Sequence, residues 1–380
     1  MSPDGEFIAV GYKEADGLAA KKTGLVRVYQ RNSMNTSYTS LGRDSMYGKA
    51  TDDEFGASVS ISNDGHRVAV GARSSSSMDK VKNGEVIVFE YSNISQSWLQ
   101  LGIPIQGMQD AARHGFSVSL SGDGFRLAVG APKDNGGTGS VGVYDYNYES
   151  KEWVILDDFI FGEADGDRTG FSVSLSNDGS TVAVGSAFTS SSNGDLSSSG
   201  STAVYKIEGG YDSNSSISLI KQGQTLVGAN DDAQFGYSVS LSSSGTRLAV
   251  GSNGFRSKNL TKVGRCAVYE LRQENWIEIG HFIGTEENEE TGLYVAIAVN
   301  GNVVSCSKIN SVGGASIGSV AILEEVKAGW NVLDVIGASL GKSSSFGAYV
   351  SLSRDGKWIV AGDPSYYSSK GFVEILTRLE

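Results

Sequence analysis

Apolar and small polar residues alternate in short stretches along this chain, and the clearest copy lies between residues 116 and 130. Over 116–120 the sequence reads Phe-Ser-Val-Ser-Leu, with every second side chain apolar. This period of two is typical of a β-strand that buries one face. The pair Asp123-Gly124 follows, and a second run occupies 126–130. An Asp-Gly pair between two such runs predicts a tight hairpin turn, because both of its positions tolerate positive φ.

Two more strands complete the unit. A glycine-rich loop leads to a third run at 141–144, and a tail over 153–156 predicts a fourth strand. In the preceding copy this outermost strand contains Pro104. A proline suits a solvent-facing edge because it donates no hydrogen bond to a neighbouring strand. Helical periodicity is absent between the runs, so we expect four antiparallel strands per unit.

The whole unit recurs along the chain with a nearly constant spacing. Its second glycine, which precedes the first strand, stands 55 to 66 residues from the next one. A fixed period of this length indicates a repeat architecture, in which each copy buries its faces against its neighbours. The positions of this glycine are Gly56, Gly115, Gly170, Gly236, Gly292 and Gly347.

Repeated units of four antiparallel strands predict a β-propeller, an all-β fold whose blades are small sheets arranged around an axis. Blades converge towards the axis, and the first strands carry small residues such as Ser58 and Ser172. Blades diverge outwards, and the later strands carry bulky residues such as Tyr144, Trp98 and Trp153. The turn after the first strand occurs seven times, which predicts seven blades. These turns are Asp4-Gly5, Asp64-Gly65, Asp123-Gly124, Asp178-Gly179, Ser244-Gly245, Asn300-Gly301 and Asp355-Gly356.

The two ends of the chain predict an incomplete first and last blade. The chain opens at the first hairpin turn and closes after a third strand at 372–376. A missing first strand would leave buried backbone groups unpaired, which is costly. We therefore expect this chain to be part of a longer polypeptide. The expected single propeller domain, 1–380, has blades at approximately 1–47, 48–106, 107–161, 162–227, 228–283, 284–336 and 337–380.

Composition disfavours several partners. The formal net charge of −12 argues against nucleic acid and anionic membrane surfaces. The chain contains no apolar run near the roughly 18 residues that a membrane span needs. Cys266 and Cys306 stand where other copies have small apolar residues, so we expect both to be buried, and a bridge between neighbouring blades stays open. Four sequons are candidate glycosylation sites, at Asn35, Asn93, Asn214 and Asn259.

The repeat also resembles a known family. The residues that carry the resemblance are Phe55-Gly56, Phe235-Gly236, Phe346-Gly347, Gly71-Ala72 and Gly130-Ala131-Pro132. They are similar to the FG-GAP repeat of integrin α-chain propellers, and the similarity covers essentially the whole chain. The resemblance implies recognition of a protein or glycan ligand outside the cell or at its surface. It also implies calcium loops between the first two strands, but the turn at 62–65 has a single acid, and calcium needs six to eight oxygen ligands.

The most acidic segments are the loops of about eight residues that lead into each first strand, here called the lead-in loops. Propeller topology places them on one face, so we expect an acidic ring that binds a cation or a basic ligand, although Asp also favours turns and solubility. Asp165-Gly166-Asp167 is the most metal-like fragment, and its two acids leave calcium without firm support. The candidate ligand-binding residues of these loops are Asp52, Asp53, Asp110, Asp165, Asp167, Asp231, Asp232 and Glu287, and Glu54 lies among them.

The loops between second and third strands share that face and differ most between copies. Several are rich in serine, and variable loops on a rigid scaffold commonly carry binding specificity. The pair Tyr366-Tyr367 in the last of these loops is a candidate contact patch. Packing across the incomplete ring is the alternative interpretation of this pair.

Catalytic signatures are weak in this sequence. It has three histidines and no recognisable Ser/His/Asp arrangement, paired histidine ligands or phosphate-binding loop with lysine. We therefore expect a non-enzymatic binding or adhesion module, extracellular or at the cell surface. Two alternatives remain open: a glycan-processing propeller enzyme that uses paired carboxylates, and an intracellular scaffold of the WD-repeat kind, although the Gly-His and Trp-Asp signatures of that family are absent.

Overall fold

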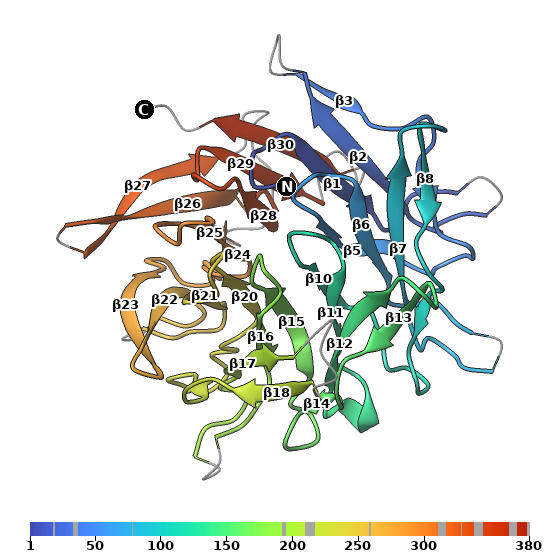
Figure 1. Ribbon diagram of the computed structural model, residues 1–380. Helices are drawn as coiled ribbons and strands as arrows, with labels where there is room; N and C mark the ends of the chain where they lie inside the picture. Colours follow the sequence, from blue (N-terminus) through green and yellow to red (C-terminus); the bar gives the residue numbers. More distant parts are fainter. Residues whose placement is uncertain are drawn as a thin grey trace. The chain divides into compact units, whose positions relative to one another are not determined.

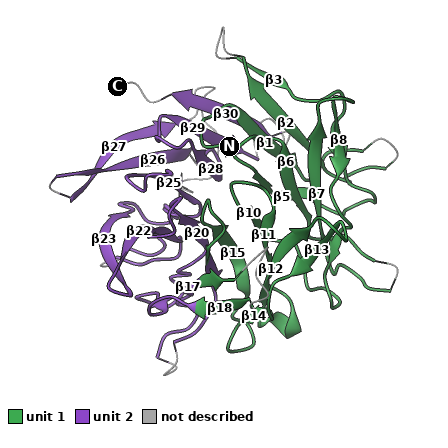
Figure 2. Cartoon of the chain, in the orientation of Figure 1, with its two compact units in different colours: residues 1–182, 206–220 green, residues 183–205, 221–380 purple. Residues whose placement is uncertain are grey.

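The computed structural model describes residues 1–17, 20–32, 37–77, 79–191, 195–209, 217–257, 260–310, 317–327, 329–337, 345–364 and 371–377. Figure 2 shows that the chain forms two compact units. Unit 1 comprises residues 1–182 and 206–220, and unit 2 comprises residues 183–205 and 221–380. Within the described ranges, no helix has the length and apolar character needed to cross a membrane.

The described strands form seven antiparallel sheets, each built from a continuous stretch of chain (Figure 1). Within a sheet, the main strands are hydrogen-bonded in the order in which they occur along the chain, and the first four sheets have a short last strand that pairs off this path. The sheets are the blades of an all-β, seven-bladed propeller, which confirms the fold predicted from the repeat.

The first three sheets lie wholly within unit 1. The first has β1 (Phe7–Tyr12), β2 (Leu25–Arg31), β3 (Tyr38–Ser40) and β4 (Met46–Tyr47). The second has β5 (Phe55–Ile61), β6 (Arg67–Ala72), β7 (Glu85–Ser92), β8 (Ser97–Gln100) and β9 (Ile105–Gln106). The third has β10 (Ser117–Leu120), β11 (Arg126–Ala131), the 3₁₀ turn η1 (Asn135–Gly137), β12 (Ser140–Asn147), β13 (Glu152–Ile155) and β14 (Ile160–Phe161).

The fourth sheet contains residues of both units. Its strands are β15 (Thr169–Leu175), β16 (Thr181–Ser186), β17 (Ser201–Glu208), β18 (Ser218–Lys221) and β19 (Leu226–Val227). In the second, third and fourth sheets the last, two-residue strand pairs with the third strand beside the start of that strand. The sequence analysis did not anticipate this fifth strand.

Unit 2 contains the remaining three sheets. The fifth has β20 (Ser238–Leu241), β21 (Arg247–Ser252), β22 (Arg265–Arg272) and β23 (Asn275–Ile283). The sixth has β24 (Val295–Ile297), β25 (Val303–Asn310), β26 (Ile317–Val326) and β27 (Gly329–Gly337). The seventh has β28 (Tyr349–Leu352), β29 (Trp358–Asp363) and β30 (Phe372–Thr377). This last sheet has three strands and the first sheet begins with a second-strand equivalent, so both are incomplete as predicted.

The hydrophobic core lies between consecutive sheets, because each sheet has two apolar faces. Ala69 and Val88 of the second sheet pack with Leu127 and Val129 of the third, and all four are buried. In unit 2, Leu248 of the fifth sheet and Val304 of the sixth belong to similar buried clusters. The second strands, such as β11, are therefore buried on both faces, and their near-continuous runs of apolar and small residues reflect this.

The Ser-x-Asp-Gly turn is a hairpin closed by its own side chains. Ser62 Oγ donates to Asp64 Oδ1, and the same oxygen accepts the amide of His66 at 3.0 Å. Arg67 N donates to Ser62 Oγ at 2.9 Å. Gly65 has a φ of 70°, which an L-residue adopts only with strain. Equivalent Ser–Asp pairs are Ser121–Asp123, Ser176–Asp178 and Ser353–Asp355.

Serines of the first strands join the second, third and fifth sheets to the sheet that follows. Ser58 Oγ donates to the carbonyl oxygen of Gly115 at 2.7 Å, and Ser117 Oγ donates to that of Gly170 at 2.9 Å. In unit 2, Ser238 Oγ makes the same bond to Gly292 at 3.1 Å. The small polar residues of the repeat thus have a structural role, which is to connect successive blades.

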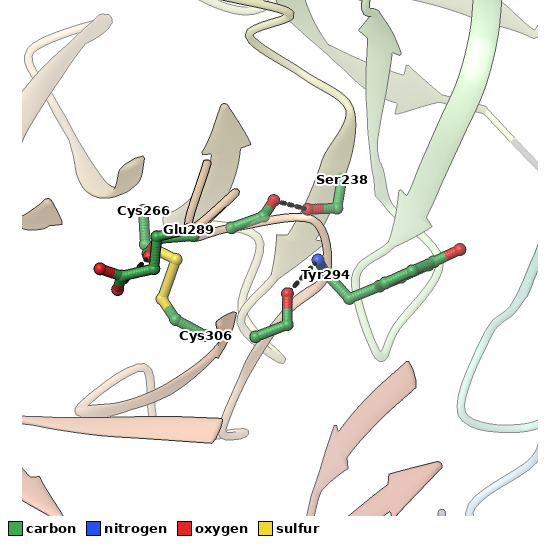
Figure 3. Close-up of a disulfide and its surroundings, with 8 residues drawn as sticks. Ser238, Cys266, Glu289, Tyr294 and Cys306 are labelled. Carbon is green, nitrogen blue, oxygen red and sulfur yellow. Dashed lines mark hydrogen bonds between the residues drawn. A yellow bond between two sulfur atoms is a disulfide. The ribbon is translucent and has the colours of Figure 1, made fainter. Parts of the chain in front are cut away.

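A disulfide adds a covalent link between two sheets of unit 2. Figure 3 shows Cys266 of β22 bonded to Cys306 of β25, with Glu289 lying beside the bridge. Both cysteines are fully buried, as expected from the apolar residues at equivalent positions. The structure thereby selects the bridged alternative that the sequence left open.

Candidate functional site

The lead-in loops of the second to sixth sheets share one backbone conformation. In the loop of the second sheet, the amide of Gly48 donates to the carbonyl of Gly24 at 3.0 Å, and Asp52, Glu54 and Gly56 have φ values of 62°, 56° and 85°. Asp232 and Gln234 in the loop of the fifth sheet have φ values of 54°. Left-handed backbone at non-glycine residues is uncommon, so the loop holds its side chains in fixed directions.

In two lead-in loops, the fifth residue after the first glycine of the loop (Gly48 or Gly162) is an acid that stabilises the loop backbone. Asp53 Oδ2 accepts the amide of Ala50 at 2.7 Å, and Asp167 Oδ2 accepts the amide of Ala164 at 2.9 Å. Both carboxylates are buried, and Ala112 occupies the same buried position in the third sheet. In both of these candidate ligand-binding residues, at least one carboxylate oxygen is therefore occupied by a backbone donor.

The acids two positions earlier hold a neighbouring loop. Asp110 Oδ1 accepts the amide of Val81 at 2.8 Å, and Asp231 Oδ1 accepts the amide of Ser197 at 2.8 Å. Glu287 Oε1 accepts a hydrogen bond from the Thr261 hydroxyl at 2.8 Å. Each of these contacts ties a lead-in loop to the preceding loop between second and third strands.

The other candidates do not gather into one site within either unit. Asp52 and Asp165 are exposed, and Asp232 pairs with Arg256 at 3.2 Å. Among the residues that the structure describes, no group of three or more His, Cys, Asp or Glu side chains could hold a metal ion. Asn93 is exposed. The remaining candidates, Tyr366, Tyr367, Asn35, Asn214 and Asn259, lie outside the described residues.

The loop into the second sheet carries two adjacent acids in contrasting surroundings, as the loop into the sixth sheet does with Glu289 and Glu290. The carboxylate of Glu54 pairs with Arg73 Nε and accepts a hydrogen bond from Ser74 Oγ at 3.2 Å. Burial alone would raise the pKa of Glu54, but the guanidinium of Arg73 outweighs it and the pKa is lowered. Glu54 therefore stays ionised at neutral pH while it remains partly open to solvent.

Asp53 has the opposite environment. Burial raises its pKa, and the charge of Glu85 raises it further, against the opposing effect of the Ala50 amide. Glu85 is itself buried, and it accepts hydrogen bonds from Lys49 at 3.1 Å and from Gln106 at 2.8 Å. The pKa values of two carboxyl groups that follow one another in sequence are thus shifted in opposite directions.

Aromatic side chains adjoin the Glu54–Arg73 pair. The guanidinium carbon of Arg73 lies 5.0 Å from the ring centroid of Phe116, a cation–π contact. The Phe116 ring lies 4.8 Å from that of Phe171. Phe116 and Phe171 are half-buried, so the charged pair has an apolar wall on one side. Together Glu54, Arg73, Ser74 and Phe116 are called the Glu54 site.

The Glu54 site offers a proton acceptor, a fixed cation and a hydroxyl within one small region. A carboxylate beside a guanidinium can activate a water molecule while the cation stabilises negative charge on a reacting oxygen. The sequence analysis noted Glu54 but missed Arg73, Glu85 and Lys49. The available signal was their departure from the repeat, since Arg73 stands where another copy has Pro132.

His114 is the one fully buried histidine of the described chain, and it belongs to the scaffold. It occupies the position of Phe55 in the repeat, its ring meets that of Tyr144 edge-on at 6.2 Å, and its Nε2 has no hydrogen-bond partner. Burial lowers its pKa to about 4, so the ring is neutral at physiological pH. A neutral ring enclosed by packing is not exposed to a substrate.

Comparison with known proteins gives matches in structure but none in sequence. No family model and no curated protein matches the chain. A candidate 6-phosphogluconolactonase from Bacteroides uniformis is similar over 99% of this chain and 93% of its own, with 11% identity and a TM-score of 0.64. One from Bacteroides fragilis covers 100% and 92%, with 12% identity and a TM-score of 0.66. The periplasmic gluconolactonase of Pseudomonas aeruginosa covers 98% and 99%, with 11% identity and a TM-score of 0.61.

These matches correct two predictions. The expectation of a non-enzymatic module that binds a protein or glycan is contradicted, because the similar structures are described as lactonases. The expectation that the chain is not an enzyme is contradicted by the same finding. Adhesion and the specific resemblance to integrin α-chains find no support, whereas the propeller does. The error has a physical source: the repeated residues specify blades, while a catalytic residue needs to occur in one copy alone.

Proposed function

We propose that this protein is a hydrolase that opens the cyclic ester of a sugar acid, with the Glu54 site as its reaction centre. The observation that carries the proposal is the half-buried pair of Glu54 and Arg73, whose carboxylate is kept ionised. The similarity in fold to lactonases over nearly the whole chain supports the same reaction class.

Hydrolysis of a lactone needs three operations that the side chains of the Glu54 site can perform. A water molecule attacks the ester carbon while Glu54 takes one of its protons. The guanidinium of Arg73 stabilises the negative charge that develops on the carbonyl oxygen. The bond to the ring oxygen then breaks, and this oxygen receives the proton held by Glu54, so that lactone and water give the hydroxy acid.

Glu54 suits the role of base better than its neighbour Asp53. Asp53 is buried and one of its oxygens is occupied by the amide of Ala50. Glu54 is about one-third exposed and its partners are side chains, which can move as a substrate binds. Phe116 would cover the apolar side of the sugar ring.

The test is hydrolysis of gluconolactone and of 6-phosphogluconolactone by the purified chain, with the spontaneous rate subtracted. We expect Glu54→Gln to lower kcat/KM by about 10² to 10⁴ and Arg73→Met by about 10² to 10³. Glu270→Gln is the matched control, because Glu270 also pairs with an arginine, Arg247, at 2.9 Å and also has a lowered pKa, in another sheet. Wild-type activity on neither lactone, or equal activity of Glu54→Gln and wild type, would refute the proposal.

We also propose that the protein works in an oxidising compartment, such as the exterior of a cell or a secretory space. The disulfide between Cys266 and Cys306 supports this location, because such bonds persist where thiols are not kept reduced. The exposed sequon at Asn93 is compatible with it. Mass spectrometry of the native protein would test the proposal, and two free thiols would contradict it.

A further inference from the structure

The third sheet departs from the repeat at the end opposite to its lead-in loop. Phe125 follows the hairpin turn, where the other copies have polar residues such as His66, Ser180 and Thr246. Tyr148 lies in the turn between β12 and β13, where the second sheet has Asn93. Two aromatic residues have thus replaced polar ones at adjoining turns of a single copy, which the scaffold itself does not require.

Tyr148 is exposed and yet held in place. Its side chain is 61% exposed, while its ring lies 5.0 Å from that of Phe125 and 5.4 Å from that of Tyr146. Tyr146 is buried and contacts Trp153 at 5.4 Å, so a continuous row of rings leads from the core to the surface. An exposed ring with fixed neighbours loses little conformational entropy when a ligand covers it.

Charged groups lie beside the ring of Phe125, against which Tyr148 packs. The guanidinium of Arg67 lies 3.8 Å from the centroid of Phe125, donates to Glu90 at 2.7 Å and donates to the carbonyl of Asp123 at 3.0 Å. Partial burial raises the pKa of Tyr148, against the effect of Arg67, and the charges of Asp123 and Glu90 add to the rise. Donors and acceptors therefore both lie close to an open aromatic face.

We propose that Tyr148, with Phe125, Arg67, Glu90 and Asp123 around it, is a binding platform for a neutral saccharide, separate from the Glu54 site. A sugar ring presents C–H groups on one face and hydroxyls on its rim. The C–H face is attracted to the negative face of an aromatic ring, and hydroxyls pair with carboxylates and guanidinium groups at the edge. A single open ring is too small for a stable protein interface. The carboxylates of Glu90 and Asp123 outnumber the guanidinium of Arg67, which disfavours an anionic ligand.

Binding of neutral hexasaccharides to the full chain tests the platform. The probes are β-1,4-glucose, β-1,3-glucose, α-1,4-glucose and β-1,4-N-acetylglucosamine hexamers, measured by calorimetry and saturation-transfer NMR. We expect at least one to bind. Tyr148→Ala should weaken it by about three- to tenfold, and Tyr148→Phe should retain it because the ring, not the hydroxyl, makes the contact.

Ile94→Ala is the matched control, because Ile94 is an apolar residue in the corresponding turn of the second sheet and is 99% exposed. Its binding should equal that of wild type. Absence of binding by all four probes, or unchanged binding by Tyr148→Ala, would overturn the proposal. Loss of binding in high salt would also overturn it, since it would indicate an ionic ligand. Lactone hydrolysis should be the same in Tyr148→Ala and wild type, which separates this test from that of the Glu54 site.

Discussion

The indole Nε1 of Trp153 donates a hydrogen bond to the carbonyl oxygen of Leu101 at 2.9 Å. This bond connects the fourth strand of the third sheet to the segment that leaves the second sheet. Trp98 makes the same contact with Leu41 at 3.0 Å. Trp98, Trp153 and Trp276 therefore join neighbouring blades at their outer strands, whereas the indole nitrogen of Trp330 has no hydrogen-bond partner among the described residues.

Substitution of Trp153 should separate the contribution of this bond from that of packing. Trp153→Phe keeps most of the apolar volume and leaves the Leu101 carbonyl without its donor, so we expect a loss of about 1 kcal/mol in the free energy of unfolding. Trp153→Ala should cost about 3 to 5 kcal/mol, because the side chain is buried. Denaturant unfolding measures both values. Val154→Ala, at a largely exposed position of the same strand, should change stability little, and a larger effect there would argue against this assignment.

His114 should make the protein less stable in mild acid. Its pKa is about 4 in the folded state and 6.5 as a free side chain, so the unfolded chain binds a proton at higher pH than the folded one does. Stability is therefore unaffected above pH 6.5 and falls as the pH decreases from 6.5 to 4, by up to about 3 kcal/mol. His114→Phe, which installs the residue of other copies, should remove this dependence. A variant with the same pH profile as wild type would contradict the prediction.

Lys308 should stabilise a buried carboxylate. Its Nζ lies 2.9 Å from Glu289 Oε1, and Glu289 also accepts the amides of Thr285 and Glu286. Burial acts to raise the pKa of Glu289, but Lys308 and the amides lower it below its ordinary value. A carboxyl group with a lowered pKa contributes stability above its unfolded pKa, and this contribution is lost as the pH falls through its folded pKa.

Replacement of this lysine should therefore be most costly at neutral pH. We expect Lys308→Met to lower the free energy of unfolding by about 2 kcal/mol at pH 7. This is less than for a fully buried pair, because Lys308 is partly exposed to solvent. The difference in the free energy of unfolding between wild type and Lys308→Met should shrink as Glu289 is protonated. Lys206→Met is the control, because Lys206 pairs with Glu208 at the surface and its replacement should leave the free energy of unfolding nearly unchanged. A deficit that is constant from pH 7 to pH 3 would show that the charge pair is not its cause.

The disulfide should contribute substantially to the stability of unit 2. It closes a loop of 40 residues, and the chain-entropy relation gives about 4 kcal/mol for such a loop. Cys266→Val together with Cys306→Val keeps apolar volume at both positions, as in other copies of the repeat. We expect the double variant to unfold at lower denaturant concentration, and wild type treated with a reductant to behave like it. Identical unfolding of oxidised and reduced wild type would be incompatible with this contribution.

Most of the fold could be predicted from the sequence because the same pattern of strands and turns is repeated along the chain. The alternation at 116–120, the turn at Asp123-Gly124 and the recurring glycines each correspond to an element of the structure. The fifth short strand, such as β9, escaped prediction because two residues carry no periodicity. The disulfide was left open because sequence spacing does not show which strands of neighbouring sheets face each other.

The candidate site was much harder to predict for the same reason. The acids Asp53 and Asp167 drew attention because they recur, yet recurrence follows from their role in closing the loops. Arg73 and Phe125 occur in one copy, so their departure from the repeat is the signal that the sequence gives, and the fold is needed to show what lies beside them. In a repeat protein, the residues shared by the copies thus identify the scaffold, and residues found in a single copy are candidates for the functional site.

The bond from Ser58 to Gly115 has a further consequence for the origin of the chain. The second, third and fifth copies each bear a serine hydroxyl that binds a carbonyl of the copy after it, whereas the sixth and seventh copies have Tyr294 and Tyr349 at this position. A tandem duplication of the coding segment would consequently deliver a new blade whose two flanks already fit its neighbours. Growth of the ring by whole copies needs no simultaneous invention of a matching surface, and the connecting loops are left free to diverge.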